Sequence, residues 1–180
     1  MTDHHARRII CLSGFMGSGK STTGRLLARQ AGWPHVDLDK RVIEAAGQSI
    51  PEIFAKLGEP AFRDIEHREL ARALDEAVGL GQPRIISLGG GTVTQARNLA
   101  LLREKAAVLV WLRCAIEELL ARCAQITDRP LFRDEASFRQ LYSQRLPSYE
   151  LSDYVVESGG DPMHVVERII ALGVFPKVTV

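Results

Sequence analysis

The stretch GFMGSGKS, residues 14–21, places glycines, a lysine and a serine at the spacing of a phosphate-binding loop. It follows a short apolar run and precedes a run with helical periodicity, which is the context that such a loop requires. Glycines let the backbone aim its N–H groups at phosphates, and a helix N-terminus adds positive potential. A chance glycine-rich turn is the alternative, and pattern and context together disfavour it. We predict that a nucleoside triphosphate binds here, contacted by Gly17, Ser18, Gly19, Lys20, Ser21 and Thr22.

Two side chains of this loop have distinct predicted roles. Lys20 is expected to reach the β- and γ-phosphates, which makes it a candidate catalytic residue, and the Ser21 hydroxyl is expected to ligate Mg²⁺. The motif does not reveal which group accepts the phosphate.

Two aspartates, Asp37 and Asp39, form a second candidate site in the stretch VDLDK. We predict a strand over HVDLD, so that both carboxylates point to one side near the carboxyl end of the strand. Open α/β sheets bind ligands along that edge. One carboxylate could hold a water of the Mg²⁺ shell, and the other could orient or deprotonate an acceptor hydroxyl. A solvated turn or a helix cap remains the alternative.

Four arginines complete the candidate chemistry: Arg63, Arg122, Arg129 and Arg145. Arg63 precedes Glu66 by three residues on a predicted helix, which allows an ion pair, and Pro130 places Arg129 in a loop. Each arginine alone is most simply a surface residue. As a set they suit a ligand that is anionic at both ends, since phosphoryl transfer needs positive charge and arginine binds carboxylates bidentately.

Three consecutive glycines, Gly89 to Gly91, follow the apolar run RIISL. Glycine is costly to order, so three in a row call for a reason. No lysine or serine follows Gly91 to complete a second phosphate loop. We predict a bare backbone surface where a small ligand meets peptide N–H groups.

These candidates need a scaffold of alternating strands and helices. Short apolar runs predict strands over 8–12, 35–39, 84–88, 107–112 and 154–158. Helical periodicity predicts helices over 20–32, 41–47, 50–78 with a break near Gly58 and Pro60, and 161–173 with Asp161 as N-cap. The alternation favours an α/β fold with a parallel sheet, as one domain over 1–180 with a polar, arginine-rich insertion.

The composition narrows the functional class. The chain has 180 residues, a net charge of +1 and 46% apolar residues, which gives no electrostatic argument for nucleic acid or an anionic membrane. No run is long enough to span a bilayer, and the N-terminus does not resemble a secretory signal. Cys11, Cys114 and Cys123 are predicted to be buried free thiols, which favours the reducing cytoplasm.

Six stretches occur in the order and spacing of shikimate kinases: GFMGSGKST, VDLD, FRDIE, SLGGG, RPL and RLPSYE. The chain resembles this family from about residue 9 to residue 171. The resemblance implies a three-layer α/β/α P-loop kinase fold, with a five-stranded parallel sheet in order 2-3-1-4-5 and a mobile lid over about 113–140. It also implies a phosphotransferase that moves the γ-phosphoryl group of ATP to the 3-hydroxyl of shikimate, a step toward chorismate and the aromatic amino acids.

On the acceptor side, the resemblance implies specific roles. Asp39 matches the residue that contacts the acceptor hydroxyl as the proposed base. Arg63 and Arg145 match the pair that binds the shikimate carboxylate, and Glu66 matches a residue that positions Arg63. The backbone of Gly89, Gly90 and Gly91 matches a shikimate-binding segment, and Phe54 and Phe62 match apolar residues by the ring.

On the nucleotide side, Arg129 matches the lid arginine that closes over the transferring phosphate, and Arg122 matches a lid-region arginine near the nucleotide. Ser87 stands where many P-loop enzymes carry a metal-binding aspartate. Mg²⁺ would therefore depend on Ser21, on Asp37 through water, and on further waters. A monomer is the implied oligomeric state.

Two alternatives remain open. A related kinase could act on gluconate, which also offers a carboxylate and hydroxyls. A non-catalytic, ligand-sensing domain could share the scaffold, although Lys20, Asp39 and Arg129 are all present and no DNA-binding extension is found.

Overall fold

Five parallel strands form one sheet in the order β2-β3-β1-β4-β5. The computed structural model describes residues 9–124 and 134–175. The strands are β1 Ile9–Ser13, β2 His35–Asp37, β3 Arg84–Ser87, β4 Val108–Arg113 and β5 Tyr154–Glu157. The strand order implied by the resemblance is confirmed.

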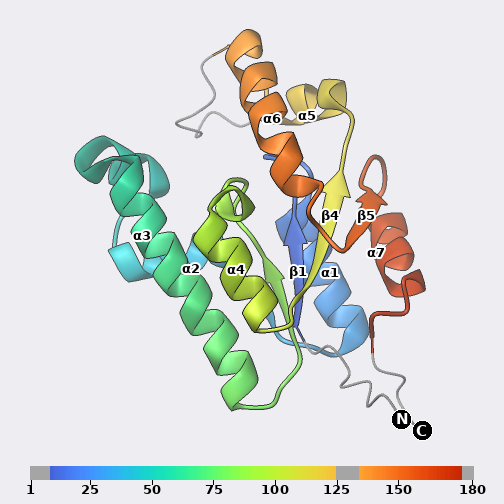
Figure 1. Ribbon diagram of the computed structural model, residues 1–180. Coiled ribbons are helices and arrows are strands. Elements are labelled where there is room, and N and C mark those ends of the chain that lie inside the picture. Colours follow the sequence, from blue (N-terminus) through green and yellow to red (C-terminus); the bar gives the residue numbers. More distant parts are fainter. Residues whose placement is uncertain (1–8, 125–133, 176–180) are drawn as a thin grey trace, which may run out of the picture.

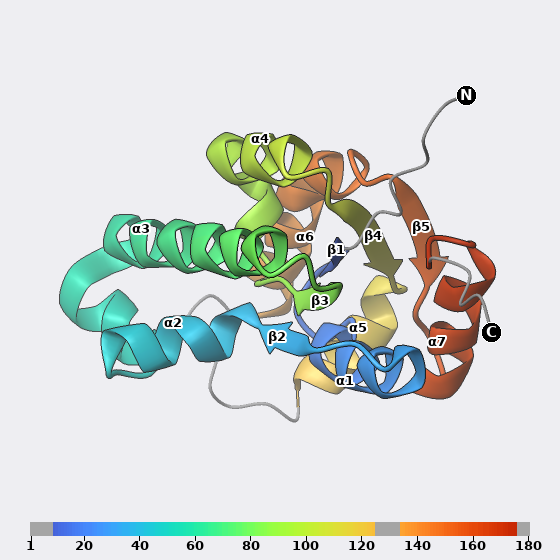
Figure 2. The same ribbon diagram turned by 90° about the horizontal axis from the view of Figure 1, so that it is seen from below.

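Helices cover both faces of the sheet and complete three layers. They are α1 Lys20–Ala31, α2 Leu38–Ala46, α3 Ile50–Gly79, α4 Ala96–Glu104, α5 Ile116–Cys123, α6 Glu135–Tyr149 and α7 Pro162–Ala171, with a 3₁₀ turn η1 at Thr92–Thr94. Figure 1 shows the strands running toward the end of the molecule where α5 and α6 lie. Figure 2 shows α1 and α7 on one side of the sheet and α3 and α4 on the other.

The central strand β1 is buried on both faces, and its side chains alternate between two cores. Ile9 and Cys11 pack into a cluster with residues of α3, α4, α5 and α6. Ile10 and Leu12 pack into a second cluster with residues of α1 and α7. A strand that is apolar at every position is typical of a parallel sheet covered by helices, and it fixes where the loop after β1 emerges.

The break predicted near Gly58 and Pro60 is confirmed. Gly58 interrupts α3 with φ 81° and ψ 170°, a conformation that a residue with a Cβ adopts only under strain. Val42 of α2 packs against Ile53 and Phe62, which lie on the two sides of this break. The break therefore builds a small third core beside the main sheet.

The strand predicted over 35–39 is too long. β2 ends at Asp37, whose side chain accepts a hydrogen bond from Lys40 N at 3.3 Å and caps α2. Asp39 lies in the first turn of that helix, so the argument that a strand holds both aspartates on one face is wrong. A short polar side chain that can cap a helix competes here with strand periodicity.

The stretch treated as a polar insertion contains helix α5 and most of α6. α6 buries Phe138, Arg145 and Tyr149, which share one face of the helix, but one of the three is charged, so no simple apolar stripe marks this face in the sequence. Two smaller predictions hold: Gly32 ends α1 with φ 67°, and Asp161 caps α7.

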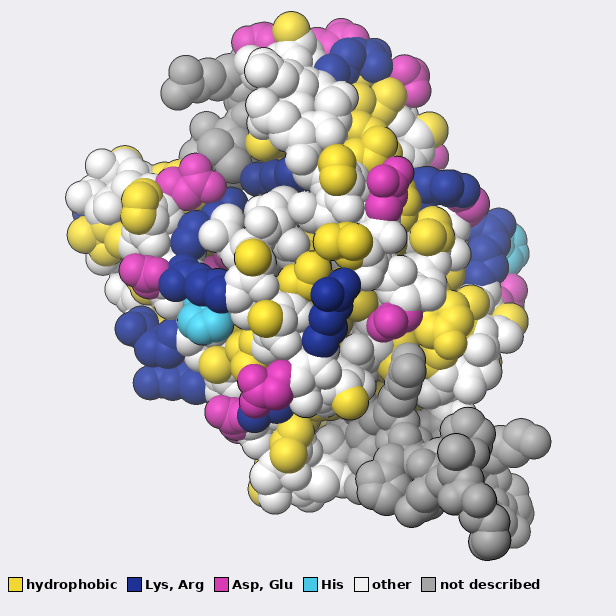
Figure 3. Space-filling view, viewed as in Figure 1, with side chains coloured by type: hydrophobic (Ala, Val, Ile, Leu, Met, Phe, Trp, Pro, Cys, Tyr) yellow, Lys and Arg dark blue, Asp and Glu magenta, His cyan; other side chains and the backbone are white. Residues whose placement is uncertain are grey.

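The surface carries charge of both signs. On the face drawn in Figure 3, acidic and basic side chains are interspersed, in keeping with the net charge of +1. Within the described ranges, no helix is long and apolar enough to cross a bilayer. The three cysteines are free and buried as predicted.

Glu76 on α3 should make the stability of the fold depend on pH in the acid range. Its carboxylate accepts hydrogen bonds from Arg41 at 2.7 and 2.9 Å and from Arg84 at 2.9 Å, which lower its pKa to about 2. Because the folded-state pKa is depressed, this stabilisation is present above about pH 4.5 and disappears as the pH falls toward 2. Glu76 is partly exposed, so we expect Glu76→Gln to cost only about 1 kcal/mol at pH 7.

Urea unfolding of the wild type and Glu76→Gln at pH 7 and pH 3 measures this difference. The difference in stability between the two proteins should be smaller at pH 3 than at pH 7. The matched control is Glu44→Gln on the exposed part of α2. A stability difference for Glu76→Gln that is the same at both pH values would contradict the assignment.

Candidate functional site

The loop between β1 and α1 has a backbone that only glycine adopts easily. Gly14, Gly17 and Gly19 have φ values of 141°, 81° and 88°. Gly19 is also the N-cap residue of α1, so the free N–H groups of the first helical turn face the loop. The spacing of glycines in the motif is thus explained by the turn itself.

A cavity of about 440 Å³ opens at this loop. It is lined by the six loop residues predicted to bind ATP and by Arg122, together with Asp39. Its walls are Gly17, Ser18, Gly19, Lys20, Ser21, Thr22, Thr23, Asp39, Leu88, Arg122, Ser158, Gly160, Pro162 and Val165. The structure therefore brings the phosphate loop, one of the two aspartates and one of the four arginines into a single site.

Two cations hold the loop in shape. Lys20 Nζ donates to the carbonyl oxygens of Gly14 at 2.8 Å and Phe15 at 2.9 Å. Arg122 Nη1 donates to Gly17 O at 3.0 Å, and its Nη2 donates to Glu118 at 2.5 Å. Both cations are therefore fixed at the rim of the cavity, where they can meet phosphate oxygens.

Ser87 holds the first turn of α1 against the sheet. Its hydroxyl donates to Lys20 O and lies 2.9 Å from His35 Nε2. Since the single hydroxyl proton is directed to the carbonyl, His35 must donate from Nε2. Burial lowers the pKa of His35, which favours the neutral ring. Gly24 leaves room for this contact, because a Cβ there would lie 2.4 Å from Ser87 Oγ.

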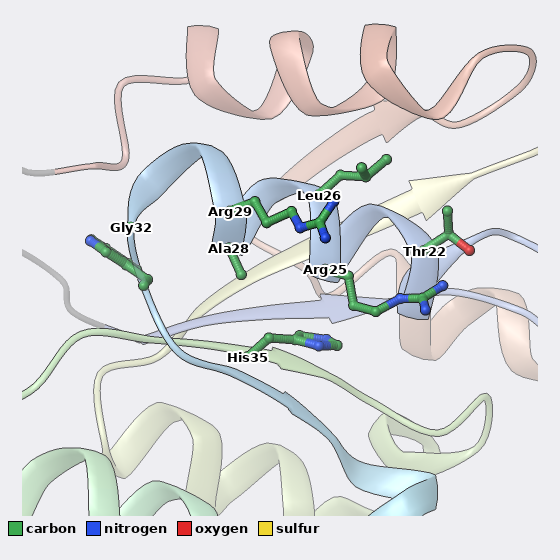
Figure 4. Close-up of a pocket in the computed structure, with 8 residues that line it drawn as sticks. Thr22, Arg25, Leu26, Ala28, Arg29, Gly32 and His35 are labelled. Atoms are coloured by element: carbon green, nitrogen blue, oxygen red, sulfur yellow. The ribbon is translucent and has the colours of Figure 1, made fainter.

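A larger cavity of about 630 Å³ lies along α1. Figure 4 shows Arg25, Arg29 and His35 at its walls, and Thr22 is common to both cavities. It lacks the residues of the phosphate loop from Gly17 to Ser21 and both aspartates, so its size does not make it the better candidate.

Arg63 is buried and is paired with two carboxylates of its own helix. Its Nη1 donates to Glu66 at 2.9 Å and its Nη2 to Glu59 at 2.9 Å. The guanidinium lies over the Phe62 ring at 5.0 Å. Phe54, half-buried, packs its ring 4.8 Å from that of Phe62. The predicted pair with Glu66 is present, and Glu59 is a partner that sequence reasoning missed.

Arg145 is as buried as Arg63, since each is 7% exposed, but its surroundings differ. It lies on α6 over the Phe15 ring at 5.6 Å, with Tyr149 beside it. Within the described part of the chain, no carboxylate forms an ion pair with it. Burial, and then repulsion from Arg63, lower the pKa of this guanidinium against the attraction of Tyr149. A buried cation without a carboxylate is an unusual cost, and an anionic ligand would relieve it.

The three glycines lie between these groups. A Cβ on Gly89 would lie 2.7 Å from Glu66 Oε1 and 2.9 Å from Asp39 Oδ1. A Cβ on Gly91 would lie 2.5 Å from Arg63 Nη2, whereas one on Gly90 would lie 3.4 Å from Arg145 Nη1. The missing side chains thus first make room for the charged groups of the protein itself, and the loop backbone lies beside both arginines.

Some predicted residues are placed elsewhere. Arg129 lies outside the described residues, so its place in the site is a prediction only. Asp37 caps α2 and is not among the residues that line the main cavity. Sequence reasoning also missed Tyr149, whose hydroxyl donates to Gly90 O at 2.5 Å. Glu59 could have been found, because it precedes Arg63 by four residues.

Comparison with known proteins agrees with this geometry. Residues 16–172 match the family model for shikimate kinase. A curated shikimate kinase from Caulobacter vibrioides is 44% identical over 167 residues, covering 91% of this chain and 80% of that protein. One from Thermodesulfovibrio yellowstonii is 37% identical over 168 residues, covering 89% and 92%.

Solved structures show the same fold. The shikimate kinase from Acinetobacter baumannii in complex with shikimate matches with a TM-score of 0.82 and 31% identity, covering 96% of both chains. A gluconokinase from Sinorhizobium meliloti matches with a TM-score of 0.60 at 19% identity, covering 92% of this chain and 91% of that one, which shows a shared fold alone. The family model and the curated relatives span most of the chain, and this protein belongs to the shikimate kinase family.

Proposed function

We propose that this kinase transfers the γ-phosphoryl group of ATP to the 3-hydroxyl of shikimate, giving ADP and shikimate 3-phosphate. The observation that carries the proposal is the buried Arg145, which lies close to Arg63 and the glycine loop and has no carboxylate partner within residues 9–124 and 134–175. A ligand with one carboxylate would complete this arrangement. The solved relative from Acinetobacter baumannii is in complex with such a ligand, shikimate.

The nucleotide occupies the cavity at the phosphate loop. Backbone N–H groups of residues 17–22 surround the phosphates, and Lys20 turns from the loop carbonyls to the β- and γ-phosphates. Arg122, which is hydrogen-bonded to Gly17 O of this loop, adds positive charge. Positioning and electrostatic stabilisation account for most of the rate in this chemistry.

Asp39 joins the two halves of the site. It lines the nucleotide cavity, and its Oδ1 lies beside Gly89 of the acceptor loop. As the acceptor oxygen forms its bond to the γ-phosphorus, its proton passes to the Asp39 carboxylate. The bond between the γ-phosphorus and the bridging oxygen breaks, and ADP leaves with that electron pair.

The described residues fit a magnesium ion held mainly by the nucleotide. Ser21 lines the nucleotide cavity, and Mg²⁺ in such enzymes typically takes few protein ligands and several waters. The Ser21 hydroxyl would be one ligand, and Asp37 would act through a water. When bound, the ion neutralises charge on the β- and γ-phosphates.

Further features of the proposal concern the whole protein. Residues of the stretch 113–140, with Arg129 over the transferring phosphate, would cover both ligands and exclude water. We also propose that the chain acts as a monomer in the cytoplasm, where reducing conditions suit three buried free thiols.

An acceptor assay tests the proposal. ADP release with ATP and Mg²⁺ should depend on shikimate, and gluconate at equal concentration should give less than about 1% of that rate, since a site built for one acceptor discriminates strongly. Activity with gluconate alone would contradict the proposal. Tight shikimate binding without turnover would instead support a ligand-sensing domain.

A further inference from the structure

A chain of buried polar groups extends from Arg63 to α4. Arg63 Nη1 donates to Glu66 Oε2 at 2.9 Å, and Thr92 Oγ1 donates to Glu66 Oε1 at 2.6 Å. Asn98 Nδ2 donates to the backbone oxygen of Thr92 at 2.9 Å. His67 Nδ1 lies 2.6 Å from Asn98 Oδ1. The chain therefore joins α3, the 3₁₀ turn after the glycine loop, and α4.

The inner members of this chain are shielded from water. Glu66 is 1% exposed, and Thr92 and Asn98 are fully buried. A buried carboxylate keeps its charge only when every oxygen has a partner, and here each oxygen has one strong donor. Removal of either donor would leave the other to position Glu66 alone.

Thr92 is held in one rotamer by its surroundings. Its hydroxyl must point at Glu66, while its backbone oxygen is fixed by Asn98. The amide of Asn98 can donate to that oxygen only in one orientation, because its Oδ1 is taken by His67. This requires a proton on His67 Nδ1, so the ring nitrogen and the amide orient each other.

We propose that Thr92 and Asn98 are positioning residues for the acceptor: they fix Glu66 and, through it, the guanidinium of Arg63. Arg63 is thereby held against Gly91 in the orientation that receives the acceptor carboxylate. The inference rests on the proposed function, because it assigns these residues to the binding of shikimate. Neither side chain contacts the reacting atoms.

The substitution Thr92→Val removes the hydroxyl and keeps the shape of the side chain. We expect the KM for shikimate to rise about five- to tenfold, with the KM for ATP within about twofold, because only the acceptor-side arginine loses its support. Thr92→Ser keeps the hydroxyl and should restore the wild-type KM. Asn98→Asp, which removes the donor to Thr92, should raise the KM for shikimate in the same direction.

Thr94→Val is the matched comparison. The Thr94 hydroxyl belongs to the same 3₁₀ turn and donates to Gly91 O at 2.7 Å, but it does not reach Glu66. If general loosening of the turn caused the effect, both valine variants would raise the KM for shikimate equally. A clearly smaller effect of Thr94→Val supports the proposal.

A double-mutant cycle with Arg63→Met tests whether Thr92 acts through Arg63. If Thr92 acts through Arg63, Thr92→Val should not raise the KM for shikimate further once Arg63 is replaced. Independent effects that multiply would overturn the positioning role, as would an unchanged KM in Thr92→Val. Wild-type protein that releases no ADP with shikimate would overturn the proposed function itself, and the positioning role with it.

Discussion

Asp39→Asn is expected to lower kcat by about 10²- to 10⁴-fold, the range typical of a lost general base. Asp39 is the one predicted catalytic carboxylate that lines the nucleotide cavity and also touches the glycine loop. Asparagine has nearly the same shape but cannot take the proton of the acceptor hydroxyl. A coupled assay of ADP release gives kcat, and calorimetric titration with shikimate shows that the acceptor still binds.

Asp37→Asn is the matched control on the same turn. Asparagine caps helices about as well as aspartate, so α2 keeps its first turn. We expect a smaller loss of kcat that diminishes at high Mg²⁺ concentration, in line with a role through a metal-bound water. A kcat for Asp39→Asn within about threefold of the wild type would refute its role as base.

The phosphate loop was predictable because a local pattern determines it. The loop needs left-handed backbone at Gly14, Gly17 and Gly19, and only a narrow set of sequences provides it. The order 2-3-1-4-5 came from the family resemblance and not from periodicity. Periodicity placed all five strands but misjudged the end of β2, because a helix cap at Asp37 outweighs the alternating pattern.

The burial of the arginines was not predictable in the same way. Taken alone, Arg63 and Arg145 each suggested a surface residue. Tertiary packing buries both; Arg63 has two carboxylate partners on its own helix, whereas Arg145 has none among the residues that the structure describes. Thr92 lies outside the quoted motifs, and Tyr149 lies in RLPSYE without a predicted role, since their partners Glu66 and Gly90 are distant in sequence. Contacts of that kind follow from the fold and not from spacing.

The role of the glycine loop was also only partly predictable from the sequence. The sequence suggested that Gly89–Gly91 leave space for a ligand, and the structure shows Glu66, Asp39 and Arg63 in much of that space. The sequence shows which residues lack a Cβ, but it does not show which neighbouring groups occupy the space that this leaves. The loop is therefore better understood as the place where the charged groups of the site meet.

Arg145→Met should raise the KM for shikimate about ten- to a hundredfold, because a charged hydrogen bond contributes about 1.5–3 kcal/mol and each 1.4 kcal/mol is about tenfold. The same change should leave the melting temperature unchanged or higher. Among the residues that the structure describes, no carboxylate pairs with this buried guanidinium, so an apolar side chain of similar length removes a desolvated charge.

Arg63→Met provides the contrast. It should weaken shikimate binding to a similar degree but lower the melting temperature, because it leaves the buried Glu66 with one donor fewer. Thermal unfolding and steady-state kinetics of the two variants separate ligand binding from folding. Equal destabilisation by both substitutions would mean that Arg145 is a structural residue. An unchanged KM for shikimate in Arg145→Met would remove it from the acceptor site, and the buried cation would then be a cost that no ligand offsets.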